Sequence, residues 1–234
     1  MKTHTLLKMI CLLIAAAFLQ NTVISASQKN GESGRIDFKN ETPANGDTVR
    51  IWNGKDLEGL KLILKKTNPD EKSPYKIVDG AIHFWGVQNG YFMTPEIYSD
   101  YKLHVEWRWP EKNERGNSGV LIHVQEPDTV WPKCIQVQLK TENAGDFIAM
   151  NGAMVKEAKG KFSDTAPKLN PSNEKPETEW NECDIICSGD SVMVYVNGLL
   201  QNKGTQMNVK EGTIGFQLES KPIEFRNIYL IKNK

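Results

Sequence analysis

The sequence predicts an all-β protein folded as a sandwich of two antiparallel sheets. Short runs that alternate apolar and polar residues recur at residues 101–109, 120–124, 135–139, 192–196 and 214–218. A period of two is typical of strands that are buried on one face only. The chain's 18 glycines and 11 prolines separate these runs, and no long stretch has the period of an amphipathic helix. Many short strands in one mid-sized chain favour a β-sandwich.

Turn residues predict how some of these strands are connected. Asn197-Gly198 follows a strand, and both residues tolerate the positive φ angles of a type I′ hairpin turn. Asp79-Gly80 predicts a second hairpin. Residues 156–179 are mostly Lys, Glu, Pro, Asn and Ser, so we expect a long surface excursion there.

The N-terminal segment has the pattern of a secretory signal peptide. Lys2 and Lys8 precede an apolar run from Met9 to Leu19, and small residues follow at 25–27. The run of about 11 residues is well short of the roughly 20 that a membrane-spanning helix needs. An uncleaved anchor is the alternative. We therefore expect a signal peptide at 1–26, a flexible linker at 27–47, a single β-sandwich domain at 48–234, and export to the periplasm or cell surface.

Charge and cysteine content narrow the partners and cofactors. Lys plus Arg and Asp plus Glu both number 29, so the chain has no electrostatic reason to bind nucleic acid. Outside the leader, Cys134, Cys183 and Cys187 remain. The last two would lie roughly 13 Å apart along a strand, whereas a disulfide needs Cα atoms within about 7 Å. We expect buried free thiols and no zinc site.

Polar side chains follow three of the predicted strands on one face. They are His104, Glu106 and Arg108 in the first strand, His123 in the second, and Gln136 and Gln138 in the third. If these strands are neighbours, the side chains form one continuous row. Such a row is often only the solvated face of a sheet. Its hydrogen-bonding residue types and the nearby Trp85, Trp107, Trp109 and Trp131 also suit a carbohydrate site.

Six motifs occur in order: Ile51-Trp-Asn-Gly-Lys-Asp-Leu57, Val78-Asp-Gly80, Tyr98-Ser-Asp-Tyr101, Glu106-Trp-Arg108, Gly116-Asn-Ser-Gly119 and Phe225-Arg-Asn-Ile228. From about residue 49 to the C-terminus the chain resembles the 3-keto-disaccharide hydrolase family. The resemblance implies a concanavalin A-like jelly-roll and an exported bacterial glycosidase of carbohydrate metabolism that acts on glycosides oxidised at C3. Family members read Glu-x-Gln where this chain has Gln136-Val-Gln138. Gln136 cannot transfer a proton, although it could orient a hydroxyl group.

The chemistry of a 3-keto-glycoside indicates which groups are needed. The C3 carbonyl acidifies the C2–H bond, so a base can form an enolate that expels the group at C1 before water adds. We expect His123 or Glu106 as the base, and Arg108 either as the enolate partner or in an ion pair with Glu106. The expected substrate-binding residues are Asn117, Ser118, Gln136, Gln138, Trp131, Asp146 and Trp85. No cofactor is certain, and His123 with Glu106 could help to bind a divalent cation.

Two other functions fit the same sequence. A conventional glycosidase needs two carboxylates roughly 5 to 9 Å apart, and Glu182 and Asp184 share a strand face at about that separation. A non-catalytic carbohydrate-binding sandwich would use exposed tryptophan and amide side chains, and it would not need an acid at position 136. All three hypotheses name a carbohydrate as the partner.

Overall fold

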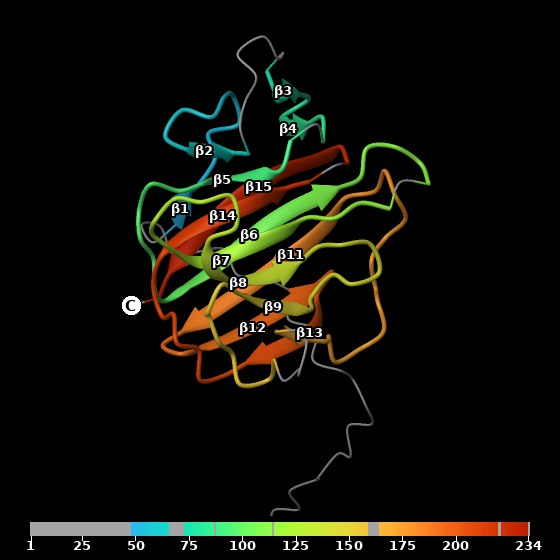
Figure 1. The fold of residues 1–234 in the computed structure, drawn as a ribbon. Coiled ribbons are helices and arrows are strands. Elements are labelled where there is room, and N and C mark those ends of the chain that lie inside the picture. Colours follow the sequence, from blue (N-terminus) through green and yellow to red (C-terminus); the bar gives the residue numbers. More distant parts are fainter. Residues whose placement is uncertain are drawn as a thin grey trace, which may run out of the picture. The chain divides into compact units, whose positions relative to one another are not determined.

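The structure is a computed structural model, and it describes residues 48–65, 73–86, 88–113, 115–158, 164–219 and 221–233. The described residues form fifteen strands in two antiparallel sheets and no helix (Figure 1). The predicted two-sheet sandwich is confirmed. Residues 1–26 and 27–47, predicted to be a signal peptide and a linker, lie outside the described residues. Nowhere in the described part of the chain is there a helix long and apolar enough to cross a membrane.

Sheet A has eight strands. In order they are β13 (Leu199–Gly204), β12 (Ser191–Val196), β11 (Asn181–Ser188), β6 (Tyr101–Arg108), β15 (Ile223–Lys232), β4 (Ala81–Phe84) and β3 (Tyr75–Val78), and β1 (Thr48–Arg50) also pairs with β15.

Sheet B has seven strands. In order they are β10 (Thr165–Ala166), β9 (Phe147–Met150), β8 (Lys133–Gln138), β7 (Gly119–Gln125), β14 (Thr213–Leu218), β5 (Gly90–Met93) and β2 (Lys61–Leu64).

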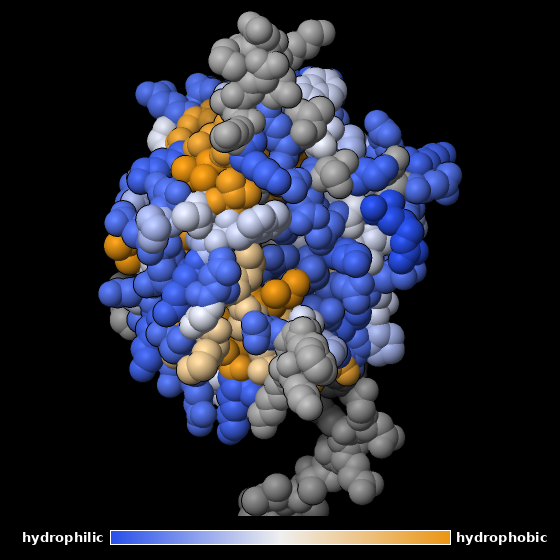
Figure 2. All heavy atoms as spheres, in the orientation of Figure 1, coloured by the Kyte–Doolittle hydropathy of each residue, from blue (hydrophilic) through white to orange (hydrophobic). Residues whose placement is uncertain are grey.

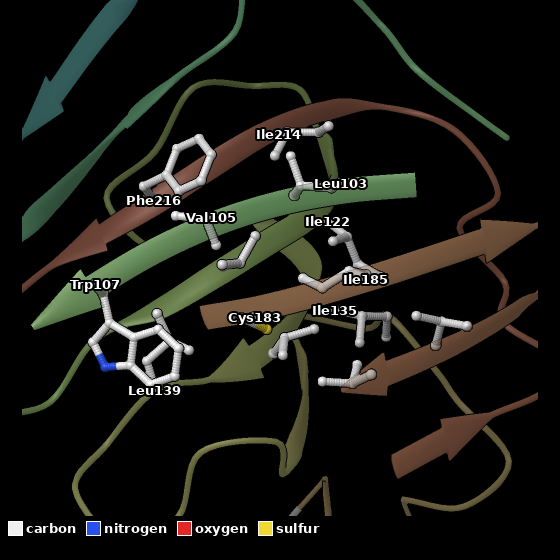
Figure 3. Packing of buried hydrophobic residues seen from close by; sticks show 14 of the residues in the cluster. Leu103, Val105, Trp107, Ile122, Ile135, Leu139, Cys183, Ile185, Ile214 and Phe216 are labelled. Carbon is white, nitrogen blue, oxygen red and sulfur yellow. The ribbon is translucent and has the colours of Figure 1, made fainter. Parts of the chain in front are cut away.

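The core lies between the inner faces of the two sheets. Leu103, Val105 and Trp107 of β6 point toward Ile122, Ile135 and Phe216 of sheet B (Figure 3). Three aromatic rings join the sheets. Phe92 stacks on Phe216 at 4.8 Å between ring centroids, and both meet the edge of Phe225, at 5.7 and 5.9 Å. This offset and edge-on geometry is favourable for aromatic rings.

The expected hairpins and thiols are confirmed. Asp79 and Gly80 join β3 to β4 with φ angles of 49° and 72°, and Asn197 and Gly198 join β12 to β13 with 47° and 76°. Cys134, Cys183 and Cys187 are buried and free.

The predicted continuous polar row is wrong. β7 and β8 pair with each other in sheet B, whereas β6 lies in sheet A between β11 and β15. The chain crosses from sheet A to sheet B between β6 and β7, so these two strands are not neighbours although they are consecutive in sequence. The polar face of β6 therefore points away from the polar faces of β7 and β8.

Some large apolar side chains reach the surface. Ile97, Met154 and Leu169 are each more than half exposed. On the face drawn in Figure 2, hydrophobic patches interrupt a mainly hydrophilic surface. Single exposed apolar residues are ordinary in folded proteins.

Phe92→Ala is expected to lower the free energy of unfolding by about 3 to 5 kcal/mol, because it removes the ring that contacts both Phe216 and Phe225. Urea denaturation followed by tryptophan fluorescence measures this. Leu169→Ala is the control, since an exposed leucine contributes little and should change the value by no more than about 0.5 kcal/mol. Equal effects of the two substitutions would contradict the assigned core.

Candidate functional site

The outer face of sheet B carries a pocket of about 370 Å³. Met93, Val124 and Thr213, which come from adjacent strands, line this pocket. The exposed Ile97 also lines it. The volume is in the range of small-molecule sites in proteins.

The charged groups of this pocket are one ammonium and three carboxylates. Lys61 of β2 has its Nζ 3.7 Å from Oδ2 of Asp128, and their side chains are 50% and 36% exposed. Glu126 and Glu211 also line the pocket. Exposed ion pairs contribute little to stability. Lys61 and Asp128 can therefore separate and bind a ligand instead of each other.

An apolar floor continues from the pocket along the same face. It consists of Tyr91, Met93, Leu121, Val124 and Cys134, which come from β5, β7 and β8. All five are at most 5% exposed. They form a cluster separate from the core between the sheets.

An amide cluster occupies the other end of this face. It consists of Asn117, Gln136, Gln138, Gln217 and Glu219. Gln136 Nε2 donates to Gln138 Oε1 at 3.0 Å and to Gln217 Oε1 at 3.1 Å. The two oxygens of Glu219 accept hydrogen bonds from Gln217 at 3.2 Å and Asn117 at 2.5 Å. The arrangement presents neutral hydrogen-bonding groups beside one carboxylate.

The Gly116-Asn-Ser-Gly119 motif holds this cluster in place. A Cβ at Gly116 would come within 2.1 Å of the Trp109 ring, and one at Gly119 within 2.6 Å of Gln136 Cγ. Ser118 Oγ donates to a backbone carbonyl of β14 at 2.7 Å. Both glycines therefore permit close packing that fixes the asparagine between them.

His123 does not lie on this outer face. The register of β7 and β8 shifts between Ile122 and Gln125, and His123 has a φ of 54°. Because the shift inserts a residue, Val124 takes the outward position. The His123 side chain is fully buried, with Nδ1 3.1 Å from the carbonyl oxygen of Val209. Burial lowers its pKa more than its backbone hydrogen bonds raise it.

Glu106 and Arg108 lie on the outer face of sheet A. The expected ion pair between them does not form, because each pairs with β15 instead. Arg108 Nε is 2.5 Å from Glu224, and Glu106 accepts hydrogen bonds from Arg226 and Asn227, both at 2.7 Å.

The surroundings of Glu106 make it a weak base. Burial raises the pKa of this carboxyl, but the nearby His104 and the hydrogen bonds from Asn227 and Arg226 outweigh burial and lower the pKa to about 2. The predicted catalytic groups His123, Glu106 and Arg108 are thus divided between the core and sheet A. Their catalytic roles stay predictions.

The other predicted binding residues are also divided. Asn117, Ser118, Gln136 and Gln138 come together at one end of sheet B, and Trp131, 38% exposed, is in the β7–β8 loop. Asp146 precedes β9 and accepts a hydrogen bond from the backbone of Lys168 at 2.8 Å, so it fixes a loop. Trp85, 41% exposed, follows β4 of sheet A, and its ring packs edge-on against His83 at 4.6 Å between ring centroids.

Glu182 and Asp184, the pair for a conventional glycosidase, lie on β11 of sheet A. Asp184 is buried and its Oδ1 is 2.6 Å from His104 Nδ1. Burial lowers the pKa of His104, but its hydrogen bond with Asp184 and the nearby carboxylate of Glu106 outweigh burial and raise the pKa to about 9. Asp184 is therefore held in an ion pair.

The described residues contain no group of three His, Cys, Asp or Glu side chains that could hold a metal ion. Binding of a divalent cation, which the sequence analysis considered, stays a prediction.

Several residues of this face were not singled out from the sequence: Lys61, Tyr91, Asp128, Gln217 and Glu219. The sequence did contain a signal for Gln217, because this polar residue alternates with apolar neighbours in the predicted strand 214–218. No sequence signal pointed to Lys61 and Asp128, because they come together only where the β7–β8 loop reaches β2.

The ion pair of His104 predicts a pH-dependent stability. A folded-state pKa of about 9, above the usual value near 6.5, stabilises the fold below about pH 6.5, and this contribution is lost as the pH rises through about 9. In urea titrations, His104→Gln should therefore cost more stability at about pH 6 than at about pH 9.5. A cost that is equal at both values would contradict the ion pair.

Gly119→Ala is expected to push Gln136 away from Gln138 and Gln217, at a cost of about 1 to 3 kcal/mol for the buried polar groups left unpaired. A double-mutant cycle with Gln136→Ala, by urea denaturation, tests the contact. The double variant should lose less stability than the two single variants together, because alanine at 136 removes the atoms that clash. Simple additivity would show that the two residues do not interact.

Residues 47–231 match the family described as the 3-keto-alpha-glucoside-1,2-lyase-like domain. No curated protein matches the chain. Among solved structures, a candidate glycosyl hydrolase from Parabacteroides distasonis is similar, with a TM-score of 0.57 and 20% identity over 80% of this chain and 94% of its own.

Two further structures are similar to this chain. The carbohydrate-binding module CBM66 of Bacillus subtilis has a TM-score of 0.55 and 10% identity over 76% of this chain and 98% of its own. The β-glucanase of Bacillus licheniformis has a TM-score of 0.52 and 12% identity over 82% of this chain and all of its own, 100%. At these identities the likeness establishes the jelly-roll fold alone. The match over residues 47–231 goes further: the chain belongs to the 3-keto-alpha-glucoside-1,2-lyase-like domain family.

Proposed function

We propose that the protein cleaves 3-keto-glycosides on the outer face of sheet B, by removing the proton at C2 and expelling the group at C1. The observation that carries this proposal is the pocket of about 370 Å³ in which Lys61 and Asp128 face each other. Membership of the family supports the class of substrate.

Asp128 is the base in this proposal. Its carboxylate is partly exposed in the pocket, so it can reach the C2 proton of a bound sugar. Lys61 then offers an ammonium group to the oxygen at C3, where negative charge develops as the enolate forms. The two groups already lie 3.7 Å apart, so one C2–C3 unit can contact both.

The amide cluster positions the hydroxyl groups of the substrate. Asn117, Gln136 and Gln138 keep the substrate-binding role expected from the sequence. Gln136 is neutral and donates both of its amide hydrogen bonds within the cluster, so it orients its neighbours and transfers no proton.

A carbohydrate-binding protein without catalytic activity is the second candidate. The amide side chain at position 136, where the resemblance leads us to expect an acid, favours it. This candidate predicts affinity for the sugar with no release of product.

The test incubates the protein with a 3-keto-glucoside and with its unoxidised parent, with and without divalent cations, and measures sugar release by mass spectrometry. We expect release from the keto form alone. Asp128→Asn should lower kcat by about 10² to 10⁴-fold, because the base is lost. Binding of the keto form without release would favour the second candidate.

Glu142→Gln is the matched control. Glu142 pairs with Arg115 at 2.5 Å, and both side chains are 65% exposed, so the substitution breaks a surface ion pair that does not line the pocket. It should leave kcat unchanged. An equal loss of kcat in both variants would contradict the catalytic role of Asp128.

A further inference from the structure

We propose that Tyr91 is a catalytic residue whose phenol donates its proton to the leaving-group oxygen when the C1–O bond breaks. The inference rests on the proposed function and adds the third group that the reaction needs. The observation behind it is an unpartnered hydroxyl. The Tyr91 oxygen is buried and makes no hydrogen bond within the described part of the chain.

The position of the ring connects this hydroxyl with the pocket. Tyr91 projects from the outer face of β5, opposite Gln217 of β14 and Ile63 of β2. The ring passes over Gly215, where a Cβ would come within 3.0 Å of the ring atom Cδ2. The glycine therefore lets the ring lean across β14 toward Leu121.

The residues packed around Tyr91 include one that lines the pocket. Tyr91 packs in the apolar floor with Met93, which also lines the pocket. Asp128, the proposed base, lies near enough for its charge to act on the phenol. The proposed base and the proposed proton donor thus come from two different elements, the β7–β8 loop and β5, and both lie beside the apolar residues Met93 and Val124.

The environment keeps the phenol protonated. Burial raises the pKa of Tyr91 well above the usual value, and the charge of Asp128 raises the pKa further. A neutral buried donor without a partner costs free energy in the unliganded protein. A substrate oxygen that accepts its hydrogen bond would remove that cost.

The proton transfers balance over one turnover. Asp128 takes the proton from C2, the C1–O bond breaks, and the leaving oxygen takes the Tyr91 proton, which leaves an enone and a phenolate. Water then adds its oxygen to C1 and gives a proton to the phenolate, while Asp128 returns its proton to C2. The Tyr91 hydroxyl is closed off in this structure, so the protein must open around it when substrate binds.

Tyr91→Phe tests the role with two substrates that differ only in the leaving group. Release of an alkoxide from an alkyl 3-keto-glucoside needs the proton and should slow by about 10² to 10⁴-fold. Release of 4-nitrophenolate needs no protonation, so the 4-nitrophenyl 3-keto-glucoside should react within a few-fold of the wild-type rate. The thermal midpoint should not fall, because the lost hydroxyl has no partner.

Tyr101→Phe is the matched control. Tyr101 is also a fully buried tyrosine, but it belongs to the core between the sheets, where its hydroxyl lies beside the Cys187 thiol. It should leave both rates unchanged. Exchange of the C2 hydrogen in D₂O isolates the first step, and Tyr91→Phe should retain it whereas Asp128→Asn should lose it.

Two results would overturn the inference. One is an equal slowing of both substrates in Tyr91→Phe, and the other is an unchanged rate with the alkyl substrate. Failure of the wild-type protein to exchange C2 or to release either leaving group is a different result. It would overturn the proposed function, and the role of Tyr91 with it.

Discussion

The fold depends on contact between the inner faces of two sheets. Phe92 and Phe216 of sheet B meet Phe225 of sheet A, and the apolar residues of β6 fill the space beside them. Once these side chains are buried, the period of two along each strand decides which side chains point outward. The two outer faces, and therefore every candidate functional group outside the core, follow from this packing.

The two outer faces use their polar residues in different ways. On sheet A, Glu106, Asp184 and Glu224 are paired with arginine or histidine partners, so their charges are already neutralised. Sheet B instead combines a pocket, an apolar floor and a cluster of amides. Groups that are already paired have little left to offer a ligand. The face with a pocket and a phenol without a partner is the better place for chemistry.

A local irregularity changes the surface of sheet B. The inserted residue at His123 reverses the alternation in β7, so an imidazole enters the core and Val124 joins the apolar floor. The β7–β8 loop begins three residues after His123 and carries Asp128. One backbone shift thus places the expected base, His123, in the core, and it lies just before the loop that carries Asp128, the proposed base.

The sequence by itself determined the strands, the hairpin turns at Gly80 and Gly198, the burial of the three cysteines and the family. These features depend on local patterns, namely alternation, turn residues and ordered short motifs. Only the tertiary structure decided which strands are neighbours, which faces are shared and which charges pair. Arg108 is two residues from Glu106 on the same strand face, but it binds Glu224, more than a hundred residues away in the sequence. Sheet pairing and loop placement come from long-range packing, which no local period can specify.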